Sequence, residues 1–266
     1  MGKAGTSYRR KTMLSAACTD IGNVKKVNQD SCLIKEALTS GGTIFFAAVC
    51  DGMGGLKNGE IASAYVTEAM SEWFSHDLAV LAADGFTGSA IKKSMNAAIL
   101  AADERVNRFS ENTGDCGTTL SAILIINGRY LTVNVGDSRV YKIDSEDLLQ
   151  LTHDQTLAQQ RVDEGEIDQE DAEKDPGQSI LLQCIGAGGD VVPDYTEGIC
   201  EKGDVFLLCS DGFRHKLSRN EIRSMYAPEK MRSEKVMEKA LRAGIDMVKK
   251  RKERDNITAV LVKKTE

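Results

Sequence analysis

The stretch "GTIFFAAVCDGMGG", residues 42–55, decides how this chain folds. Residues 42–50 are apolar and rich in β-branched and aromatic side chains, so they predict a buried strand. The strand stops at Asp51-Gly52, where the glycines predict a turn whose backbone needs the torsions that glycine permits. A bare carboxylate is therefore expected at the end of a core strand.

The same pattern occurs again in "VFLLCSDG", where a predicted strand at 204–210 ends at Asp211-Gly212. Three more aspartates lie at the margins of apolar runs: Asp30 in "VNQDSCLI", Asp137 in "VNVGDSRV" and Asp255 in "RDNITAVLV". A single aspartate often marks a turn, because its side chain bonds the nearby backbone. Five of them at core margins need a further explanation, since a carboxylate near the core costs several kcal/mol unless it is paired or binds a cation.

Basic partners for these carboxylates are scarce nearby, and only Arg139 and Arg254 could pair with two of them. Hard divalent cations are the better solution, since Mg²⁺ and Mn²⁺ prefer oxygen ligands. Zinc is disfavoured, because the three histidines are scattered and the seven cysteines include no C-x-x-C pair. Two ions about 3.5–4 Å apart are a common device for directing water at a phosphoryl group. Asp51 is the best candidate for a shared carboxylate, and the Gly52 carbonyl is a further candidate ligand.

The bulk composition is that of a soluble globular protein, with 266 residues, 41% hydrophobic and 28% charged, and a formal net charge of -6. The acidic balance argues against a nucleic-acid partner. Residues 1–18 contain no apolar signal-peptide core, and no run approaches the roughly 18 apolar residues of a membrane span. The pattern of cysteines indicates a reducing compartment. We therefore expect a cytoplasmic protein that does not bind membranes.

Strands are expected at 13–20, 30–37, 42–50, 117–128, 129–143, 204–210 and 257–264, and helices at 58–74, 89–109 and 233–251. The Asn-Gly pair at 127–128 predicts a hairpin, and we expect 13–20 to pair with 30–37. Strands adjoin one another and helices form separate blocks, which does not fit β-α-β alternation. The expected fold class is α+β, with two antiparallel sheets and helices outside. Residues 1–266 are expected to form one domain, from which the acidic stretch 155–180 makes an excursion.

Seven motifs occur in the order and spacing of a known family: "GNVKKVNQDS", "VCDGMGG", "CGTTLSAILI", "VGDSRVY", "LTHDQT", "LLCSDGF" and "RDNITAVLV". On these motifs the chain resembles the PPM family of metal-dependent protein Ser/Thr phosphatases, the type 2C class, in its compact bacterial form. The resemblance runs from about Leu14 to Lys264. It implies a four-layer α-β-β-α sandwich, with two central antiparallel sheets flanked by helices. It also implies that 155–180 is the variable flap of the family.

The resemblance implies that the metal ligands are Asp30, Asp51, Gly52, Asp137, Asp211 and Asp255. Asp51 would bridge two ions of Mn²⁺ or Mg²⁺, and the Gly52 carbonyl would bind the second ion. Asp211 and Asp255 would bind the first. Asp30 would close on the pair, directly or through water.

The chain departs from the family pattern at positions that bear on mechanism. Lys25 stands where an arginine usually grips the phosphoryl oxygens, and a lysine supplies a point charge without the bidentate fork. Met53 replaces a histidine proposed as general acid in eukaryotic members, so protonation of the leaving group is expected from water on the metal ions. His215 stands where an acidic residue usually helps Asp137 and Asp211 to hold a third, weaker metal ion.

An imidazole at this third site would change its metal preference. Neutral imidazole suits Mn²⁺ better than Mg²⁺, and it binds only when unprotonated. The third site is therefore expected to be weak or empty in Mg²⁺ and better filled in Mn²⁺. The alternative is that His215 points away and the site is vacant.

The function implied is hydrolysis of phosphoserine and phosphothreonine in proteins, by a water activated on two Mn²⁺ or Mg²⁺ ions and without a phosphoenzyme. The partners implied are phosphorylated proteins, the substrates of a Ser/Thr kinase, and a monomer is expected. Two alternatives stay open. One is a catalytically weak PPM domain used for regulation or binding, to which the residues at Lys25 and His215 point. The other is a dinucleotide-binding enzyme, prompted by the glycines of 52–55, although this stretch lacks the G-x-G-x-x-G spacing.

Overall fold

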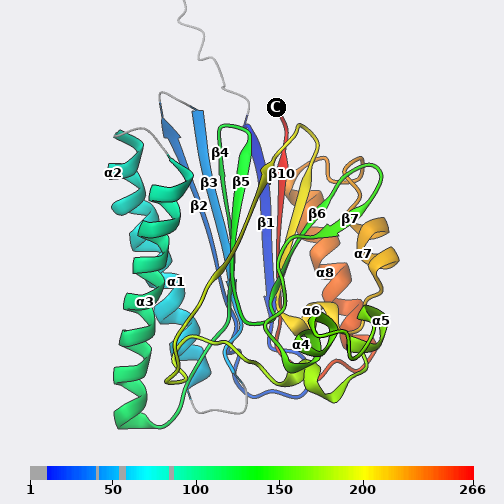
Figure 1. Cartoon of the computed structure of the whole chain (residues 1–266). Helices are drawn as coiled ribbons and strands as arrows, with labels where there is room; N and C mark the ends of the chain where they lie inside the picture. Colours follow the sequence, from blue (N-terminus) through cyan, green and yellow to red (C-terminus); the bar gives the residue numbers. More distant parts are fainter. Residues whose placement is uncertain (1–10, 40–41, 54–57, 84–86) are drawn as a thin grey trace, which may run out of the picture.

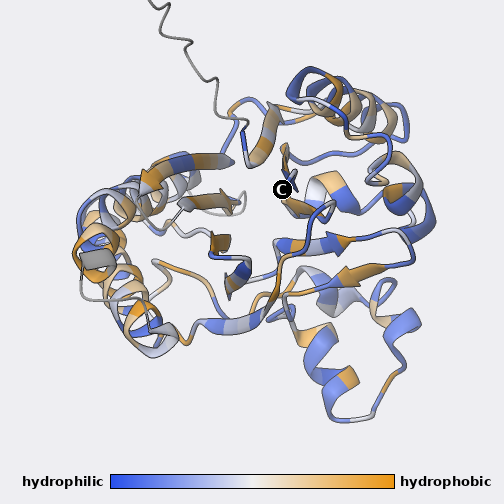
Figure 2. Ribbon diagram, turned by 90° about the horizontal axis from the view of Figure 1, so that it is seen from above, coloured by the Kyte–Doolittle hydropathy of each residue, from blue (hydrophilic) through white to orange (hydrophobic). Residues whose placement is uncertain are grey.

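Two five-stranded antiparallel sheets pack face to face in the computed structural model, which describes residues 11–39, 42–53, 58–83 and 87–266. Helices cover both outer faces, so the layers follow the order helix, sheet, sheet, helix (Figure 1). Seen from above, the outer helices lie on opposite sides of the strands (Figure 2). This arrangement confirms the α+β sandwich. Its antiparallel pairing also argues against a dinucleotide-binding enzyme, whose sheet is mostly parallel.

The first sheet has the strand order β1 (Met13–Asp20), β10 (Ile257–Lys264), β9 (Val205–Cys209), β6 (Arg139–Ile143) and β7 (Leu148–Gln150). The second has the order β2 (Ser31–Thr39), β3 (Gly42–Cys50), β4 (Leu120–Ile126), β5 (Arg129–Val135) and β8 (Asp194–Ile199). The helices on the second sheet are α1 (Gly59–Ser75), α2 (Asp77–Ala83) and α3 (Gly88–Thr113). Those on the first sheet are α6 (Asp211–Arg214), α7 (Arg219–Met225) and α8 (Glu234–Lys250). The stretch 155–180 contains α4 (Leu157–Asp163), α5 (Gln169–Ala172) and the 3-10 helix η1 (Pro176–Ser179).

The central strands are buried on both faces, which explains why their sequences are continuous apolar runs. In β3, Phe46 packs under α1 and α3, whereas Phe45 packs between the sheets. In β9, Leu207 packs under α8, whereas Phe206 packs between the sheets. The Phe206 ring contacts Tyr130 of the other sheet, with 5.5 Å between the ring centroids. Alternate residues of one strand therefore belong to two different cores.

The Asn-Gly hairpin joins β4 to β5, and both turn residues have positive φ, 50° for Asn127 and 73° for Gly128. Positive φ at both positions is what a type I′ turn requires, so the hairpin prediction is confirmed. The expected strand 129–143 is divided at Gly136, whose φ is 99°. Its two parts, β5 and β6, belong to different sheets. Asp137 therefore lies where the chain crosses between the sheets.

The pairing expected between 13–20 and 30–37 is wrong. β1 pairs with β10, and β2 pairs with β3 in the other sheet. The edge of β2 is taken by β3, because β3 follows β2 almost at once and a hairpin between them closes at a small cost in entropy. The sequence also did not indicate β7, β8, α2, α6 or α7, since these elements are short or largely exposed.

Phe206→Ala is expected to lower the free energy of unfolding by about 3–5 kcal/mol, because it leaves a cavity between the sheets. Leu149→Ala on the edge strand β7 is the control, since Leu149 is 55% exposed. The control should change that free energy by less than about 0.5 kcal/mol. Urea unfolding followed by the fluorescence of Trp73 measures both variants. Equal destabilisation by the two would contradict this account of the core.

Candidate active site and metal centre

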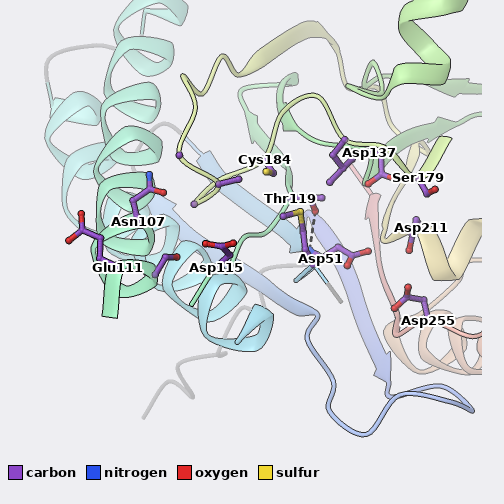
Figure 3. Close-up of a pocket in the computed structure, with 16 residues that line it drawn as sticks. Asp51, Asn107, Glu111, Asp115, Thr119, Asp137, Ser179, Cys184, Asp211 and Asp255 are labelled. Atoms are coloured by element: carbon purple, nitrogen blue, oxygen red, sulfur yellow. Dashed lines mark hydrogen bonds between the residues drawn. The ribbon is translucent and has the colours of Figure 1, made fainter. Parts of the chain in front are cut away.

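Four carboxylates from both sheets line one cavity of about 860 Å³ at an end of the sandwich. Asp51 directly follows β3, and Asp211 directly follows Ser210 at the start of α6. Asp137 lies in the crossing from β5 to β6, and Asp255 lies just before β10. Figure 3 shows all four side chains around the same space. The packing of the two sheets thus brings together residues that are far apart in the sequence.

The described lining of this cavity is acidic and contains no lysine, arginine or histidine. Besides the four aspartates, Glu111 and Asp115 line the wall near the C-terminal end of α3, and Cys184 lies between the two groups (Figure 3). Like charges in a confined, partly desolvated space create a strongly negative potential. A cavity with six carboxylates and no basic side chain therefore attracts cations.

Two threonines of the "CGTTLSAILI" motif fix the backbone of Asp51. The Asp51 N–H donates to Oγ1 of Thr119 at 3.0 Å. The Asp51 carbonyl accepts from the Thr119 N–H at 2.9 Å and from Oγ1 of Thr118 at 2.9 Å. Thr119 Oγ1 also bonds Ser138 Oγ at 2.8 Å, which links the strand end to the β5–β6 crossing. Both backbone groups of Asp51 are satisfied, and its side chain lines the cavity (Figure 3).

Gly52 and Gly212, which follow the two strand-end aspartates, lie directly against neighbouring backbone. A Cβ on Gly52 would clash with the carbonyl oxygens of Gln29 and Gly59. A Cβ on Gly212 would clash with the carbonyl oxygen of Asn256. Only glycine allows so close an approach of two backbones.

This close packing corrects the expectation that the residue after Asp51 needs unusual torsions. Neither Gly52 nor Gly212 has a positive φ, so space and not torsion selects glycine there. The remaining glycines of the motif, at 54–55, lie outside the described residues. The consequence for the site is that each aspartate is held by a strand end with little freedom to shift.

Asp30 lies behind the cavity and not in its wall. Asp30 is 8% exposed, and its Oδ2 accepts a hydrogen bond from Ser210 Oγ at 2.9 Å. Its Oδ1 has no hydrogen-bond partner among the described residues, and neither has Oδ1 of Asp211. A buried carboxylate oxygen without a partner is costly. These two atoms are the clearest structural sign that a cation belongs here.

Burial and mutual repulsion raise the pKa values of these carboxyl groups. Burial, followed by the charges of Asp30 and Asp211, raises the pKa of Asp51 well above its ordinary value. Burial is also the main cause that raises the pKa of Asp30 to about 7 and the pKa of Asp137 to about 7. The carboxylates therefore resist ionising together at neutral pH unless positive charge is supplied.

Lys25 supplies positive charge beside the cavity. Its Nζ lies 2.7 Å from Oδ1 of Asp255, and its side chain is 26% exposed. Burial lowers the pKa of the Lys25 ammonium, but the hydrogen bond and charge of Asp255 raise it more, so that the pKa lies above its ordinary value. An ammonium has three donors. Lys25 is therefore charged, and it can bind an anion while it keeps its ion pair with Asp255.

Asn256 holds the loop that carries Lys25 against the start of β10. Asn256 Nδ2 donates to the carbonyl of Ile21 at 3.0 Å and to that of Val27 at 3.1 Å. Its Oδ1 accepts from the Gln29 N–H at 2.9 Å. Asn256 is 2% exposed. One buried amide thus bonds three backbone groups of a single loop and fixes the place of Lys25.

Two arginines lie behind Asp137. Arg214 Nη2 is 3.2 Å from the carbonyl oxygen of Asp137 and 3.4 Å from its Oδ2. Arg139, considered from the sequence as a partner for a site aspartate, instead bonds both carboxylate oxygens of Asp154 at 2.9 Å. Arg254, the other residue considered, is exposed and makes no ion pair with any described residue. The pairing arginine is therefore Arg214, which the sequence did not indicate.

His215 lies beside Asp211 but lines a second, smaller cavity. Its Nε2 is 3.7 Å from Oδ2 of Asp211, and burial lowers its pKa. The second cavity measures about 80 Å³ and is also lined by Arg139 and Arg214. Metal binding by His215 stays a prediction.

The oxygen atoms of the main site fit hard divalent cations. Within the described ranges no three His, Cys, Asp or Glu side chains are already gathered at metal-ligand spacing. One carboxylate oxygen of Asp255 pairs with Lys25, and one of Asp30 accepts a hydrogen bond from Ser210. The set nevertheless offers only oxygen donors, two of them buried and unpaired, next to a cavity without basic residues. This is the donor chemistry that Mg²⁺ and Mn²⁺ prefer.

Sequence reasoning missed the residues that position the site: Thr118, Thr119, Ser210, Asn256 and Arg214. The first four lie inside the quoted motifs, and Ser210 and Asn256 directly adjoin Asp211 and Asp255, so the motifs were a usable signal. Arg214 directly follows the motif "LLCSDGF", but only the tertiary packing shows that it is buried against Asp137, a residue 77 positions away.

Comparison with known proteins identifies relatives along most of the chain. A family model described as Protein phosphatase 2C matches residues 23–261. The chain is 33% identical over 251 residues to the serine/threonine protein phosphatase PstP of Mycobacterium tuberculosis, with 92% of the chain covered. It spans only 44% of the length of that relative. It is 30% identical over 252 residues to the serine/threonine phosphatase stp of Listeria monocytogenes, which covers 92% of the chain and 94% of the relative.

A solved structure supports the same relationship. The catalytic domain of PstP in complex with two manganese ions superposes with a TM-score of 0.74 at 29% identity. The match covers 96% of this chain and 99% of that structure. The sandwich described above is thus an architecture shared with that domain.

Gly52→Ala is expected to lower the free energy of unfolding by about 1–3 kcal/mol, because the added methyl group forces two backbones apart. It should also weaken Mn²⁺ binding, since Asp51 moves with the strand end. Gly88→Ala, whose Cβ would meet only ordinary contacts with Glu197, is the control and should change the free energy of unfolding by less than about 0.5 kcal/mol. Thermal unfolding and Mn²⁺ calorimetry measure both effects. A Gly52→Ala variant with the stability and Mn²⁺ affinity of the wild type would refute the packing argument.

Proposed function

Because the chain belongs to the protein phosphatase 2C family, we propose that it removes phosphate from phosphoserine and phosphothreonine side chains of proteins. The observation that carries the proposal is the cavity itself. Its lining holds six carboxylates and no basic side chain among the described residues, and Lys25 lies beside it. An anionic substrate binds such a cavity only if cations first fill it.

The cations are proposed to be two ions of Mn²⁺ or Mg²⁺, held by Asp30, Asp51, Gly52, Asp211 and Asp255. When bound, such ions lower the pKa of water and offset the charge of a phosphoryl group. The unpaired oxygens of Asp30 and Asp211 support this assignment. The manganese complex of the PstP catalytic domain supports it as well.

Lys25 is proposed to bind the phosphoryl oxygens. Asp255, at 2.7 Å, keeps the ammonium next to the cavity, and the Asn256-held loop fixes its distance. A lysine contributes a point charge, so it orients a phosphoryl group less strictly than the fork of an arginine. Met53 lines the cavity beside Asp51 and has no proton to give, so the leaving oxygen takes its proton from water.

Direct attack by water, without a phosphoenzyme, fits the side chains of the cavity. Its described lining has no histidine to activate a hydroxyl group as nucleophile. Burial raises the pKa of the Cys184 thiol, which keeps it protonated and unreactive. Thr119 is engaged with Asp51 and Ser138. Asp51, Asp211 and Asp255 are proposed to bind the metal ions, so water is the proposed nucleophile.

The proposed substrates are proteins phosphorylated by a Ser/Thr kinase. Residues 1–266 are proposed to form one domain, which works in the cytoplasm as a monomer. No described helix is both long and apolar enough to cross a bilayer.

The competing proposal is a catalytically weak PPM domain used for binding. The complete set of strand-end aspartates favours the enzyme, and hydrolysis of a phosphothreonine peptide with and without Mn²⁺ separates the two.

Asp51→Asn is expected to abolish hydrolysis of a phosphothreonine peptide, because a neutral amide cannot offset the charge of two cations. It should also weaken Mn²⁺ binding in calorimetry. Asp246→Asn, on the exposed face of α8, is the matched control and should behave as wild type. More than roughly a tenth of wild-type turnover in Asp51→Asn at saturating Mn²⁺ would overturn the two-metal assignment.

Lys25→Ala is expected to lower kcat/KM by roughly 10- to 150-fold, the equivalent of about 1.5–3 kcal/mol for a hydrogen bond to a charged group. Lys25→Arg should retain or improve kcat/KM, because arginine adds the bidentate fork. Lys26→Ala, on the exposed neighbour, controls for loss of general positive charge. Steady-state kinetics on one phosphopeptide compares the three variants. Unchanged kcat/KM in Lys25→Ala would remove Lys25 from the site.

A further inference from the structure

Asp137 is paired with a buried cation that the chain itself supplies. Asp137 is 6% exposed and Arg214 is 8% exposed. Arg214 Nη2 lies 3.2 Å from the carbonyl oxygen and 3.4 Å from Oδ2 of Asp137, so it contacts the backbone and the side chain together. Removing one partner from such a buried pair leaves the other charge uncompensated. The pair is therefore strongly held in place.

The pair belongs to a group of two guanidinium groups and two carboxylates, beside which Asp211 adds a further negative charge that acts on Asp137. Arg214 Nη2 lies 3.5 Å from Oδ2 of Asp154 as well. Asp154 in turn accepts hydrogen bonds from Nε and Nη2 of Arg139, at 2.9 Å and 2.7 Å. Two guanidinium groups thus offset two carboxylates. A divalent cation on Asp137 would bring two further positive charges next to Arg214, where these carboxylates are already paired.

The residues around Asp137 therefore do not fit the third metal ion that the family resemblance implied. We propose that Arg214 takes the place of that ion, so that the chain binds two metal ions and not three. This inference rests on the proposed function, because it presumes the two-metal site at Asp51. Arg214 acts as a positioning residue for Asp137, and His215, which lines the smaller cavity, is not a metal ligand.

The experiment counts Mn²⁺ ions on the whole chain, by calorimetry and by the electron paramagnetic resonance signal of free Mn²⁺. Neither readout depends on activity. The wild type is expected to bind two equivalents. Arg214→Met removes the charge but keeps a long side chain, and it should bind three. Arg214→Lys and His215→Ala are the controls and should bind two, with circular dichroism confirming that every variant is folded.

If Arg214→Met does not fold, Asp137→Asn decides the question. Two equivalents in both Asp137→Asn and wild type would support the inference. Three in wild type and two in Asp137→Asn would overturn it and leave the proposed function intact. A folded Arg214→Met that still binds two equivalents would overturn the role of Arg214. A wild type that binds no Mn²⁺ would overturn the proposed function itself, and this inference with it.

Discussion

Repulsion among carboxylates at the ends of core strands is the constraint on which the site of this sandwich depends. The strand ends cannot move apart, because the inter-sheet core around Phe45 and Phe206 holds the two sheets together. The negative charge of the carboxylates must instead be offset by positive groups at different positions around the cavity. Lys25 forms an ion pair with Asp255 beside the cavity, and Arg214 forms one with Asp137 behind it. The proposed metal ions would offset the charge of the carboxylates between them.

The rigidity of the backbone turns this repulsion into a binding site. Gly52 and Gly212 let two strand ends rest against other backbones, and Thr118 and Thr119 use up the backbone bonds of Asp51. The carboxylates are thus prevented from relaxing outward into solvent. Holding like charges together lowers the free energy of unfolding of a protein, and binding of cations to the folded state raises it again.

The sequence indicated those features that depend on local pattern. Residues 42–50 predicted a buried strand, the Asn-Gly pair predicted the hairpin, and Asp51 and Asp211 indicated where strands end. It did not show that β1 joins β10, because the pairing is set by the far end of the chain. It did not show Arg214 on Asp137 either, since a charged residue in a helix gives no sign of burial before the sheets are assembled.

The hydrogen bonds of Asn256 have a consequence for motion. Because one buried amide ties Ile21, Val27 and Gln29 to the start of β10, the loop that carries Lys25 opens only when that strand end loosens too. Loop and strand are therefore expected to open as one cooperative unit, in which the Gln29 N–H, bonded to Asn256 Oδ1, exchanges with solvent only when both loosen. The lysine is in place before any ligand arrives, so little ordering entropy is lost when an anion binds there.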